Sequence, residues 1–251
     1  EDFYPSWEFG GKAVSIRSSG VHPALVEHGV FEACVQGISS GFAPLAARYN
    51  QMTQVNQGIF ASMAQPGNIV VEHNEIEDAL GGFFVAHAHP EGSVSMEHNE
   101  ISTDTENVSA GIVLLFNQAP AKLMENHVRI KEAGSGILVF DARRATLHDN
   151  TVEIDNPGAA EAGIDLQHLR QSLLETNTMR GAGTGGPANI ALRITSSPGN
   201  VYCCNTLDNT RLGARISGGS LATDNFRGTA FSNHNTSLLL PNVNAVLGTQ
   251  T

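Results

Sequence analysis

The stretch from Asn68 to Val139 contains one pattern three times: VEHNEI at residues 71–76, MEHNEI at 96–101 and LMENHV at 123–128. Each copy is followed by a glycine and an apolar run that begins at Gly82-Phe83, Gly111-Ile112 or Gly136-Ile137. A pattern that returns after about 25 residues is typical of an array of stacked structural units.

The same pattern extends over most of the chain. Its turn position is occupied in order by Gly29, Asn50, Asn74, Asn99, Asn126, Asn150, Asn177, Asn205 and Thr229. The residues three before and two after each turn position are apolar, from Val26 and Phe31 in the first copy to Phe226 and Phe231 in the last. The repeat therefore predicts two inward-facing positions in every unit.

The residue types favour short strands joined by sharp corners. Asparagine and glycine tolerate the left-handed conformation that a corner requires, and stacked asparagine side chains can hydrogen-bond to one another. A helix is disfavoured because asparagine, glycine and β-branched residues recur where good helix formers are needed. We predict an all-β coil of about nine rungs, with adjacent rungs about 4.8 Å apart.

Asn-x-Ile followed by Gly-Ile resembles the repeat of right-handed, single-stranded parallel β-helix proteins, the class of pectate lyases, other polysaccharide-active enzymes and surface proteins. The resemblance covers residues 21–240. The part from Tyr202-Cys203-Cys204-Asn205-Thr206 to Leu247-Gly248 also resembles β-helix segments of large secreted surface proteins of Bacteroidota type. We therefore expect a capping segment at 1–20, a β-helix at 21–240 and a tail, or the start of a following segment, at 241–251.

Composition narrows the function classes. The net charge of −11 disfavours nucleic acid as a partner, because a phosphate backbone requires clustered Lys and Arg. No apolar run approaches the roughly 18 residues that span a bilayer. The chain opens on Glu1-Asp2-Phe3, so we expect a signal peptide to be absent or already removed. With the resemblance, these features favour an extracellular or cell-surface location.

Three cysteines are present, Cys34 and the adjacent pair Cys203 and Cys204. An odd number gives no disulfide framework, and no zinc-type spacing accompanies them. We interpret them as buried small hydrophobic residues, in preference to a vicinal disulfide between residues 203 and 204.

Outward positions after the asparagine predict a charged face. One column contains Glu75, Glu100, His127, Thr151 and Thr178; the next contains Glu77, Ser102, Arg129, Glu153 and Arg180; the third contains Ala79, Asp104, Lys131 and Asp155. Insertions at 104–109, 155–162 and 181–188 follow this strand, and lengthened loops beside a sheet often form a groove wall. The candidate ligand-binding residues are Glu77, Glu100, His127, Glu153 and Arg180.

Two interpretations of this face compete. In a polysaccharide lyase, Asp104 and Asp155 would hold Ca²⁺ through oxygen ligands, and Lys131 or Arg129 would act on the proton next to a uronate carboxylate. In the alternative, opposite charges pair across neighbouring strands on a solvated surface. The second interpretation requires no cofactor, and we favour it.

A histidine column precedes the turn at His28, His73 and His98, with glutamates 27, 72 and 97 beside it. Imidazole and carboxylate groups could bind Zn²⁺ or another transition metal. Arg48 and Tyr49 interrupt the column, and we expect Arg48 to pair with Glu27 and Glu72. We favour an exposed ladder of turns.

The strands after the glycine do not alternate between apolar and polar residues. Their outward members would form an apolar patch of Phe60, Phe84, Val113, Leu115, Leu138 and Phe140. Strands that are apolar on both faces are normally covered on both, so we expect either a cover from the same chain or a contact with a partner.

The sequence thus favours a secreted or cell-surface β-helix module with a structural, adhesion or carbohydrate-binding role. Its partner would be a polysaccharide or another extracellular protein, without membrane insertion. The alternatives are a lyase or glycoside hydrolase that acts on acidic polysaccharide, with Ca²⁺ as its ion, and a subunit of a larger extracellular assembly joined through the coil ends or the apolar patch.

Overall fold

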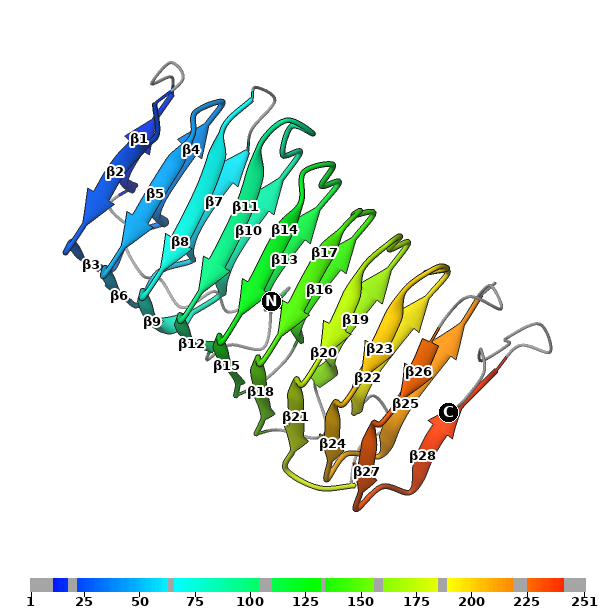
Figure 1. The fold of residues 1–251 in the computed structure, drawn as a ribbon. Coiled ribbons are helices and arrows are strands. Elements are labelled where there is room, and N and C mark those ends of the chain that lie inside the picture. Colours follow the sequence, from blue (N-terminus) through cyan, green and yellow to red (C-terminus); the bar gives the residue numbers. More distant parts are fainter. Residues whose placement is uncertain are drawn as a thin grey trace, which may run out of the picture.

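The chain winds into a coil of short parallel strands, seen in a computed structural model that describes residues 11–17, 22–62, 66–103, 110–131, 134–155, 160–184, 189–218 and 225–241. These residues form 28 strands in three sheets, and the described part of the chain contains no helix. Figure 1 shows the strands succeeding one another from β1 to β28 along the axis of the coil.

Sheet A has ten strands. They are β1 (Lys12–Ile16), β4 (Gln36–Gly41), β7 (Gln57–Ser62), β10 (Gly81–Ala86), β13 (Ala110–Leu115), β16 (Gly134–Phe140), β19 (Ala160–Gln167), β22 (Ile190–Thr195), β25 (Leu212–Ser217) and β28 (Thr236–Leu239). This sheet contains the Gly-Ile half of the repeat.

Sheet B has nine strands that lead to the asparagine. They are β2 (Ala24–Glu27), β5 (Leu45–Arg48), β8 (Asn68–Glu72), β11 (Ser93–Glu97), β14 (Ala121–Met124), β17 (Ala145–His148), β20 (Leu173–Glu175), β23 (Val201–Cys203) and β26 (Asn225–Arg227).

Sheet C has nine strands that follow the asparagine. They are β3 (Val30–Glu32), β6 (Gln51–Thr53), β9 (Glu75–Ala79), β12 (Glu100–Thr103), β15 (His127–Ile130), β18 (Thr151–Ile154), β21 (Thr178–Gly181), β24 (Thr206–Asp208) and β27 (Ala230–Ser232).

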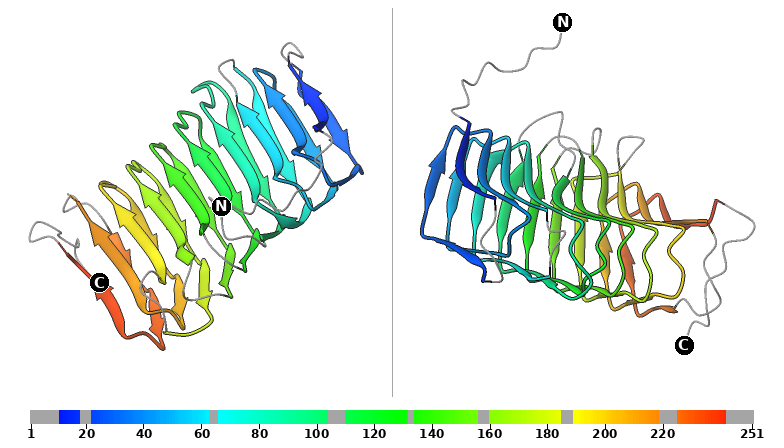
Figure 2. Two further views of the ribbon diagram at one scale, coloured as in Figure 1. Left: turned by 180° about the vertical axis from the view of Figure 1, so that it is seen from behind. Right: turned by 90° about the horizontal axis from the view of Figure 1, so that it is seen from above.

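Each rung contributes one strand to every sheet, and each strand pairs in parallel with its equivalent one rung away. Two views from other sides show the same regular succession of rungs (Figure 2). Parallel connections of this kind are right-handed in nearly all proteins. The predicted right-handed parallel β-helix of about nine rungs is confirmed.

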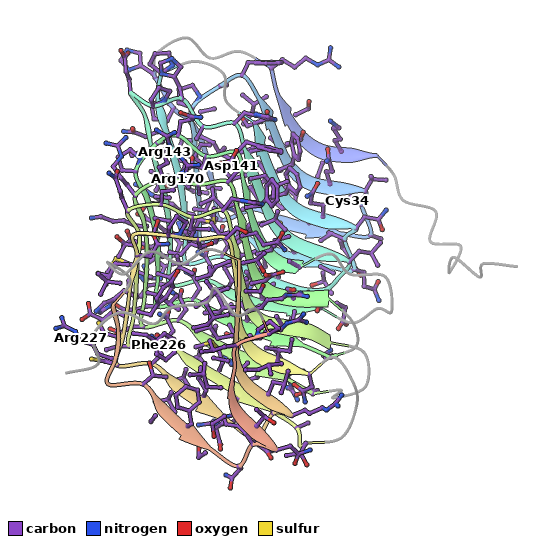
Figure 3. The ribbon with its side chains drawn as sticks, turned by 90° about the vertical axis from the view of Figure 1, so that its right-hand side faces the viewer. Cys34, Asp141, Arg143, Arg170, Phe226 and Arg227 are labelled. Atoms are coloured by element: carbon purple, nitrogen blue, oxygen red, sulfur yellow. The ribbon has the colours of Figure 1, made fainter. Side chains whose placement is uncertain are left out.

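The predicted inward positions form the core. Three residues before the turn, Val71, Met96 and Leu123 are fully buried; two residues after it, Ile76 and Val128 are equally buried. In the Gly-Ile half, the second residue is inward and the third is outward, as Ile112 and Val113 illustrate. The core therefore runs as continuous apolar columns, with Cys34 near the first rungs and Phe226 near the last (Figure 3).

The asparagines form an unbroken ladder inside the coil from Asn50 to Asn205. At each of its six steps, the Nδ2 of one asparagine donates to the Oδ1 of the next over 2.8–3.1 Å. The same Oδ1 accepts the backbone N–H of the preceding asparagine over 3.0–3.2 Å. Since these side chains are almost wholly buried, the ladder satisfies polar groups that would otherwise be costly to bury.

The corner itself differs from the prediction that asparagine adopts the left-handed conformation. The residue before the turn position does so, with φ between 53° and 60°, before Gly29 at His28 and before the seven asparagines at Tyr49, His73, His98, Glu125, Asp149, Thr176 and Cys204. The asparagine side chain must point into the coil to join the ladder, so the residue before it adopts the left-handed conformation that turns the chain. The predecessor's side chain consequently points outward.

The glycine of the repeat is needed for close packing between sheets C and A. A Cβ atom at Gly82 would lie 2.7 Å from the Ile101 side chain and 2.4 Å from the carbonyl oxygen of Gly111. The inward residue of sheet C fills this space in the same way at the other glycines of the repeat, so Asn-x-Ile and Gly-Ile pack against each other as one unit.

The predicted domain boundaries are partly described. In the predicted capping segment, β1 pairs with β4 as the first strand of sheet A. Residues 1–10 and 18–20, with the aromatic residues expected to cover an end, lie outside the described residues, as do 242–251. A search of the described part finds no helix that is long and apolar enough to cross a membrane.

The ladder predicts a large loss of stability when one asparagine is removed. Asn126→Ala deletes the acceptor of two Asn99 donors and the donors to Met96 and Asn150. Each unsatisfied buried group costs about 1–3 kcal/mol, so we expect the free energy of unfolding to fall by about 3 kcal/mol or more. Urea denaturation measures the change.

The matched control is Asn68→Ala, because Asn68 is exposed and its Oδ1 accepts one hydrogen bond, from Ser93. This variant should lose less than about 1 kcal/mol. Equal losses in the two variants would contradict a special role for the ladder.

Candidate functional site

The outer face of sheet C brings together most of the predicted ligand-binding residues. Glu100, His127 and Thr151 are neighbours in one column, and Arg129, Glu153 and Arg180 in the next. His127 lies 3.9 Å from a Glu100 oxygen and 3.5 Å from a Glu153 oxygen, and Arg180 lies 3.7 Å from Glu153. Acidic and basic groups therefore alternate along the coil.

A β-bulge follows Glu77, and the prediction that Ala79 stands in one column with Asp104 is wrong. The register between β9 and β12 shifts so that Ile76 faces Ile101 and Ala79 faces Thr103. Two residues, Glu77 and Asp78, consequently oppose Ser102, and Asp78 adopts a φ of 51°. Bulges of this kind reorient side chains, and this one makes Asp78 a member of the charged face that the sequence did not reveal.

The two predicted catalytic residues are each held by a carboxylate. Lys131 donates from Nζ to Asp78 over 2.9 Å, two rungs away. Arg129 donates from Nε to Asp155 over 2.8 Å. The expected backbone neighbourhood of Arg129 and Glu153 is confirmed, but the side chain of Arg129 pairs with Asp155.

Only half of the predicted calcium site can be placed. Asp155 is on the charged face, whereas Asp104 lies outside the described residues together with the rest of 104–109. Half of each of the other two predicted groove loops, at 156–159 and 185–188, is outside them as well. The roles given to Lys131, Arg129, Asp104 and Asp155 stay predictions.

The predicted apolar patch lies on the outer face of sheet A. Phe60, Phe84, Val113 and Leu138 form one column, and Leu115 and Phe140 are neighbours in a second. Phe60 and Phe84 stack with their ring centroids 5.4 Å apart. Val113 keeps 3% of its surface exposed and the other five residues are half-buried.

The patch ends at a buried ion pair. Asp165 follows Leu138 in the same column, and Arg193 follows Asp165. The Asp165 side chain is 3% exposed; its Oδ2 lies 3.0 Å from Arg193 and accepts a hydrogen bond from Gln167 over 2.9 Å. A carboxylate on an outward position is thus almost completely removed from water, which sequence position alone does not indicate.

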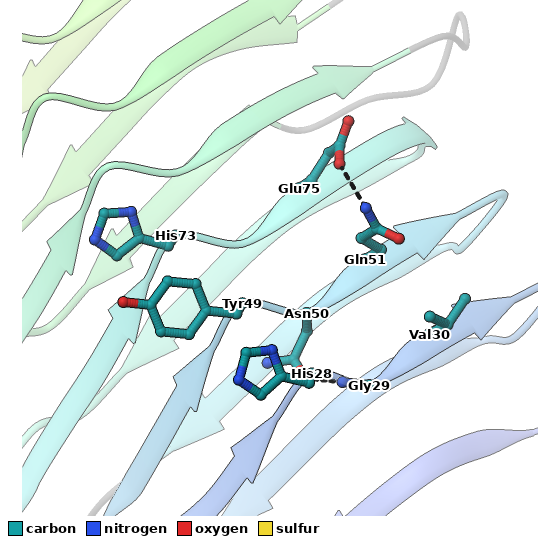
Figure 4. A pocket seen from close by; sticks show the side chains of 8 residues that line it. All are labelled: His28, Gly29, Val30, Tyr49, Asn50, Gln51, His73 and Glu75. Carbon is teal, nitrogen blue, oxygen red and sulfur yellow. Dashed lines mark hydrogen bonds between the residues drawn. The ribbon is translucent and has the colours of Figure 1, made fainter.

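The corner between sheets B and C carries the histidine column. His28, Tyr49, His73 and His98 stack with nearly parallel rings and centroids 4.8–5.3 Å apart. Arg48 pairs with Glu27 and Glu72 as predicted. The stack borders a shallow depression of about 390 Å³ that includes Gln51 and Glu75 (Figure 4). Tyr49 and His73 each have a neighbouring ring stacked on both faces, so their ring edges are the parts that border the depression.

Farther along the same corner lies a group of Glu175, Cys203 and Cys204. One ligand atom from each, a carboxylate oxygen and two sulfur atoms, lies within 4.8 Å of the other two. The Cys203 thiol contacts Glu175 over 3.3 Å, and burial, together with this hydrogen bond, raises the pKa of Cys203 to about 11. Cys34 and Cys203 are buried as predicted, but Cys204 is exposed.

The sequence analysis did not identify this group, although the spacing of the repeat indicates part of it. Glu175 and Cys203 each stand two residues before a ladder asparagine, so the repeat alone places them on adjacent rungs. Among the described residues, no other set of three or more histidine, cysteine, aspartate or glutamate side chains is close enough to hold one metal ion.

A family profile described as "Periplasmic copper-binding protein (NosD)" matches residues 26–238, which is most of the coil. The chain belongs to the NosD family. The family is described as periplasmic. This agrees with the predicted extracellular or cell-surface location in the broad sense of a location in the cell envelope.

Among solved structures, the chain is similar to a mutant of DFA-IIIase from Arthrobacter chlorophenolicus A6 in complex with DFA-III, with a TM-score of 0.50 and 12% sequence identity. The match covers 78% of this chain and 48% of that protein, so the chain spans about half of its length. At this identity the similarity shows the β-helix fold alone. No curated protein matches the chain significantly.

The buried ion pair predicts an unequal response to the loss of an arginine. Arg193→Met removes a charged partner of a carboxylate that is 3% exposed, and breaking a buried pair costs about 3–5 kcal/mol. Arg180→Met, whose pair with Glu153 is exposed, should cost less than about 1 kcal/mol. Thermal and urea unfolding compare the two variants.

A double variant, Asp165→Leu with Arg193→Met, should recover much of the lost stability, because it removes the buried charge as well as its partner. If the double variant is less stable than Arg193→Met, the account of this pair is wrong.

Proposed function

We propose that the protein is a module of the cell envelope or cell surface that binds an extended polysaccharide along the outer face of sheet C. One observation supports the proposal. Carboxylate, imidazole and guanidinium groups of Glu100, His127, Glu153 and Arg180 stand in register on adjacent rungs, at the strand spacing of about 4.8 Å.

The scaffold favours binding to a long chain molecule. A β-helix holds these side chains on a rigid sheet, so little conformational entropy is lost when a ligand binds. Glu100, Arg129 and Arg180 are exposed, and their oxygen and nitrogen atoms suit hydroxyl groups as acceptors and donors. The net charge of −11 disfavours a polyanion, so the proposed ligand is a neutral polysaccharide.

Catalysis is the weaker alternative on the same face. A lyase needs a base directed at the substrate, whereas Lys131 and Arg129 each donate to a carboxylate of the protein. The lyase hypothesis therefore requires at least one of these two ion pairs to open when substrate binds.

Retention of the protein in gels that contain neutral or uronate polysaccharides tests the binding role. We expect retention by neutral polymers and a decrease of about thirtyfold in affinity for Glu100→Gln with Glu153→Gln, because each substitution replaces a hydrogen bond to a charged group by a neutral one and loses about 1 kcal/mol. Lys122→Ala, an exposed change on sheet B, is the control and should bind normally.

Two results would contradict the proposal. If no polymer slows the migration of the protein, the binding role is contradicted. The lyase hypothesis would be supported if a uronate polymer gave an unsaturated product that depends on Ca²⁺ and is lost in Lys131→Ala. The solution mass of the same sample tests a structural role in a larger assembly, which would join copies through the coil ends or the apolar patch.

Copper binding is the second candidate function. It is suggested by the NosD description and favoured by the group of Glu175, Cys203 and Cys204. Thiolate ligands select Cu(I) over hard cations, so the donor set fits this metal. The corresponding role for the protein would be to hold copper in the cell envelope.

Metal analysis of the reduced chain tests this second function. After incubation with Cu(I) and gel filtration, we expect about one copper per chain and a higher unfolding temperature, because a ligand that binds only the folded state stabilises it. A chain that retains no copper and unfolds at an unchanged temperature would contradict the copper role.

A further inference from the structure

The group of Glu175, Cys203 and Cys204 is built by the register of the coil. Glu175 ends β20, Cys203 ends β23, and the two residues face each other across adjacent rungs. Cys203 is 3% exposed, Glu175 is half-buried and Cys204 is exposed. The three side chains therefore form a site with a buried floor and one open side.

The left-handed corner explains why two consecutive thiols share this site. In a strand, neighbouring side chains point to opposite faces, and Tyr202 is inward while Cys203 is outward. Cys204 has a φ of 60°, which breaks the alternation, and its side chain is outward as well. Asn205 then returns to the interior and joins the ladder.

Geometry disfavours a disulfide as the alternative use of these thiols. Adjacent Cα atoms across a trans peptide are about 3.8 Å apart, below the separation of about 4.4–6.8 Å in unstrained disulfides. No cis peptide occurs in the described chain. Cys34 belongs to the first rungs and cannot serve as a partner (Figure 3). A disulfide between them would be strained and easily reduced, so the geometry favours the dithiol form, which can bind a metal.

Basic side chains lie on the rungs at both sides of the site. His148, one rung before Glu175, lies with Nε2 3.9 Å from the other carboxylate oxygen of Glu175 and with Nδ1 2.9 Å from Asp149. Arg227, one rung after Cys203, is exposed on the same column. Two thiolates and a carboxylate carry three negative charges, more than one bound Cu(I) or Zn²⁺ ion neutralises. A guanidinium nearby therefore lowers the electrostatic cost of bringing the three anionic groups together.

We propose that Glu175, Cys203 and Cys204 form a binding site for one thiophilic d¹⁰ ion, Cu(I) or Zn²⁺. Two sulfur ligands and one carboxylate oxygen suit these ions, whereas Ca²⁺ and Mg²⁺ require oxygen ligands. The proposal rests on the copper-binding candidate above for its biological metal, but it assigns the ligands independently of which of the two ions is bound.

The test titrates the full, reduced chain with Cu(I) and, separately, with Zn²⁺ against a chromogenic competing chelator. We expect one equivalent of at least one ion. Cys204→Ser should weaken binding by more than about 100-fold, beyond the 10–100-fold typical of outer-shell changes, and Glu175→Gln by about tenfold or more. Cys34→Ala removes a buried cysteine distant from the site and should bind normally.

A measurement on the unaltered chain avoids dependence on the folding of variants. Alkylation of Cys204 by N-ethylmaleimide, followed by mass spectrometry, should be rapid without metal, because Cys204 is exposed, and at least tenfold slower with the bound ion. Ca²⁺ at the same concentration should give no protection.

The outcomes separate this inference from the copper function. Copper binding that Cys204→Ser leaves unchanged would overturn the site and keep the function. Zinc binding through Cys204 without copper binding would support the site and remove the copper role. If neither ion binds and neither slows the alkylation of Cys204, the site and the copper function both fail.

Discussion

The hydrogen-bonded ladder from Asn50 to Asn205 is the interaction on which the rest of the structure depends. Each side chain accepts from the main chain and the amide of its predecessor and donates to its successor, so a shift of one rung by a single residue would leave several buried groups unpaired. Such groups cost about 1–3 kcal/mol each. The ladder therefore fixes the register of every rung against the next, and the apolar columns beside it supply the burial.

Because the register is fixed, residues at equivalent positions of successive repeats lie next to one another on the surface of the coil. The alternating charges of sheet C and the apolar patch of sheet A exist as surfaces because equivalent residues of successive rungs are neighbours. The bulge in β9 is the informative exception. By placing Glu77 and Asp78 opposite one residue of β12, it directs Asp78 to Lys131 two rungs away, and a cation that had appeared available for catalysis becomes part of an ion pair.

The corner before the asparagine separates the constant interior from a variable exterior. The interior position is asparagine on seven consecutive rungs, while the left-handed residue that precedes it varies from histidine and tyrosine to aspartate and cysteine. Its side chain is outside the coil, so substitution there leaves the ladder intact. The stacked rings near the first rungs and the thiol group near the last are two products of this freedom. Membership of the NosD family fixes the scaffold, and the function depends on such exterior residues.

The sequence by itself determined the fold class, the number of rungs, the inward positions and, apart from the bulge in β9, the columns of sheet C. It could do so because a period of about 25 residues, a buried amide and apolar positions at constant offsets leave a single arrangement that satisfies all three. The same counting would have placed Glu175 beside Cys203. Only the tertiary structure decided which residue takes the left-handed conformation, where the register slips and how deeply Asp165 is buried. Those features depend on backbone dihedral angles and on contacts from other rungs, which a one-dimensional pattern does not contain.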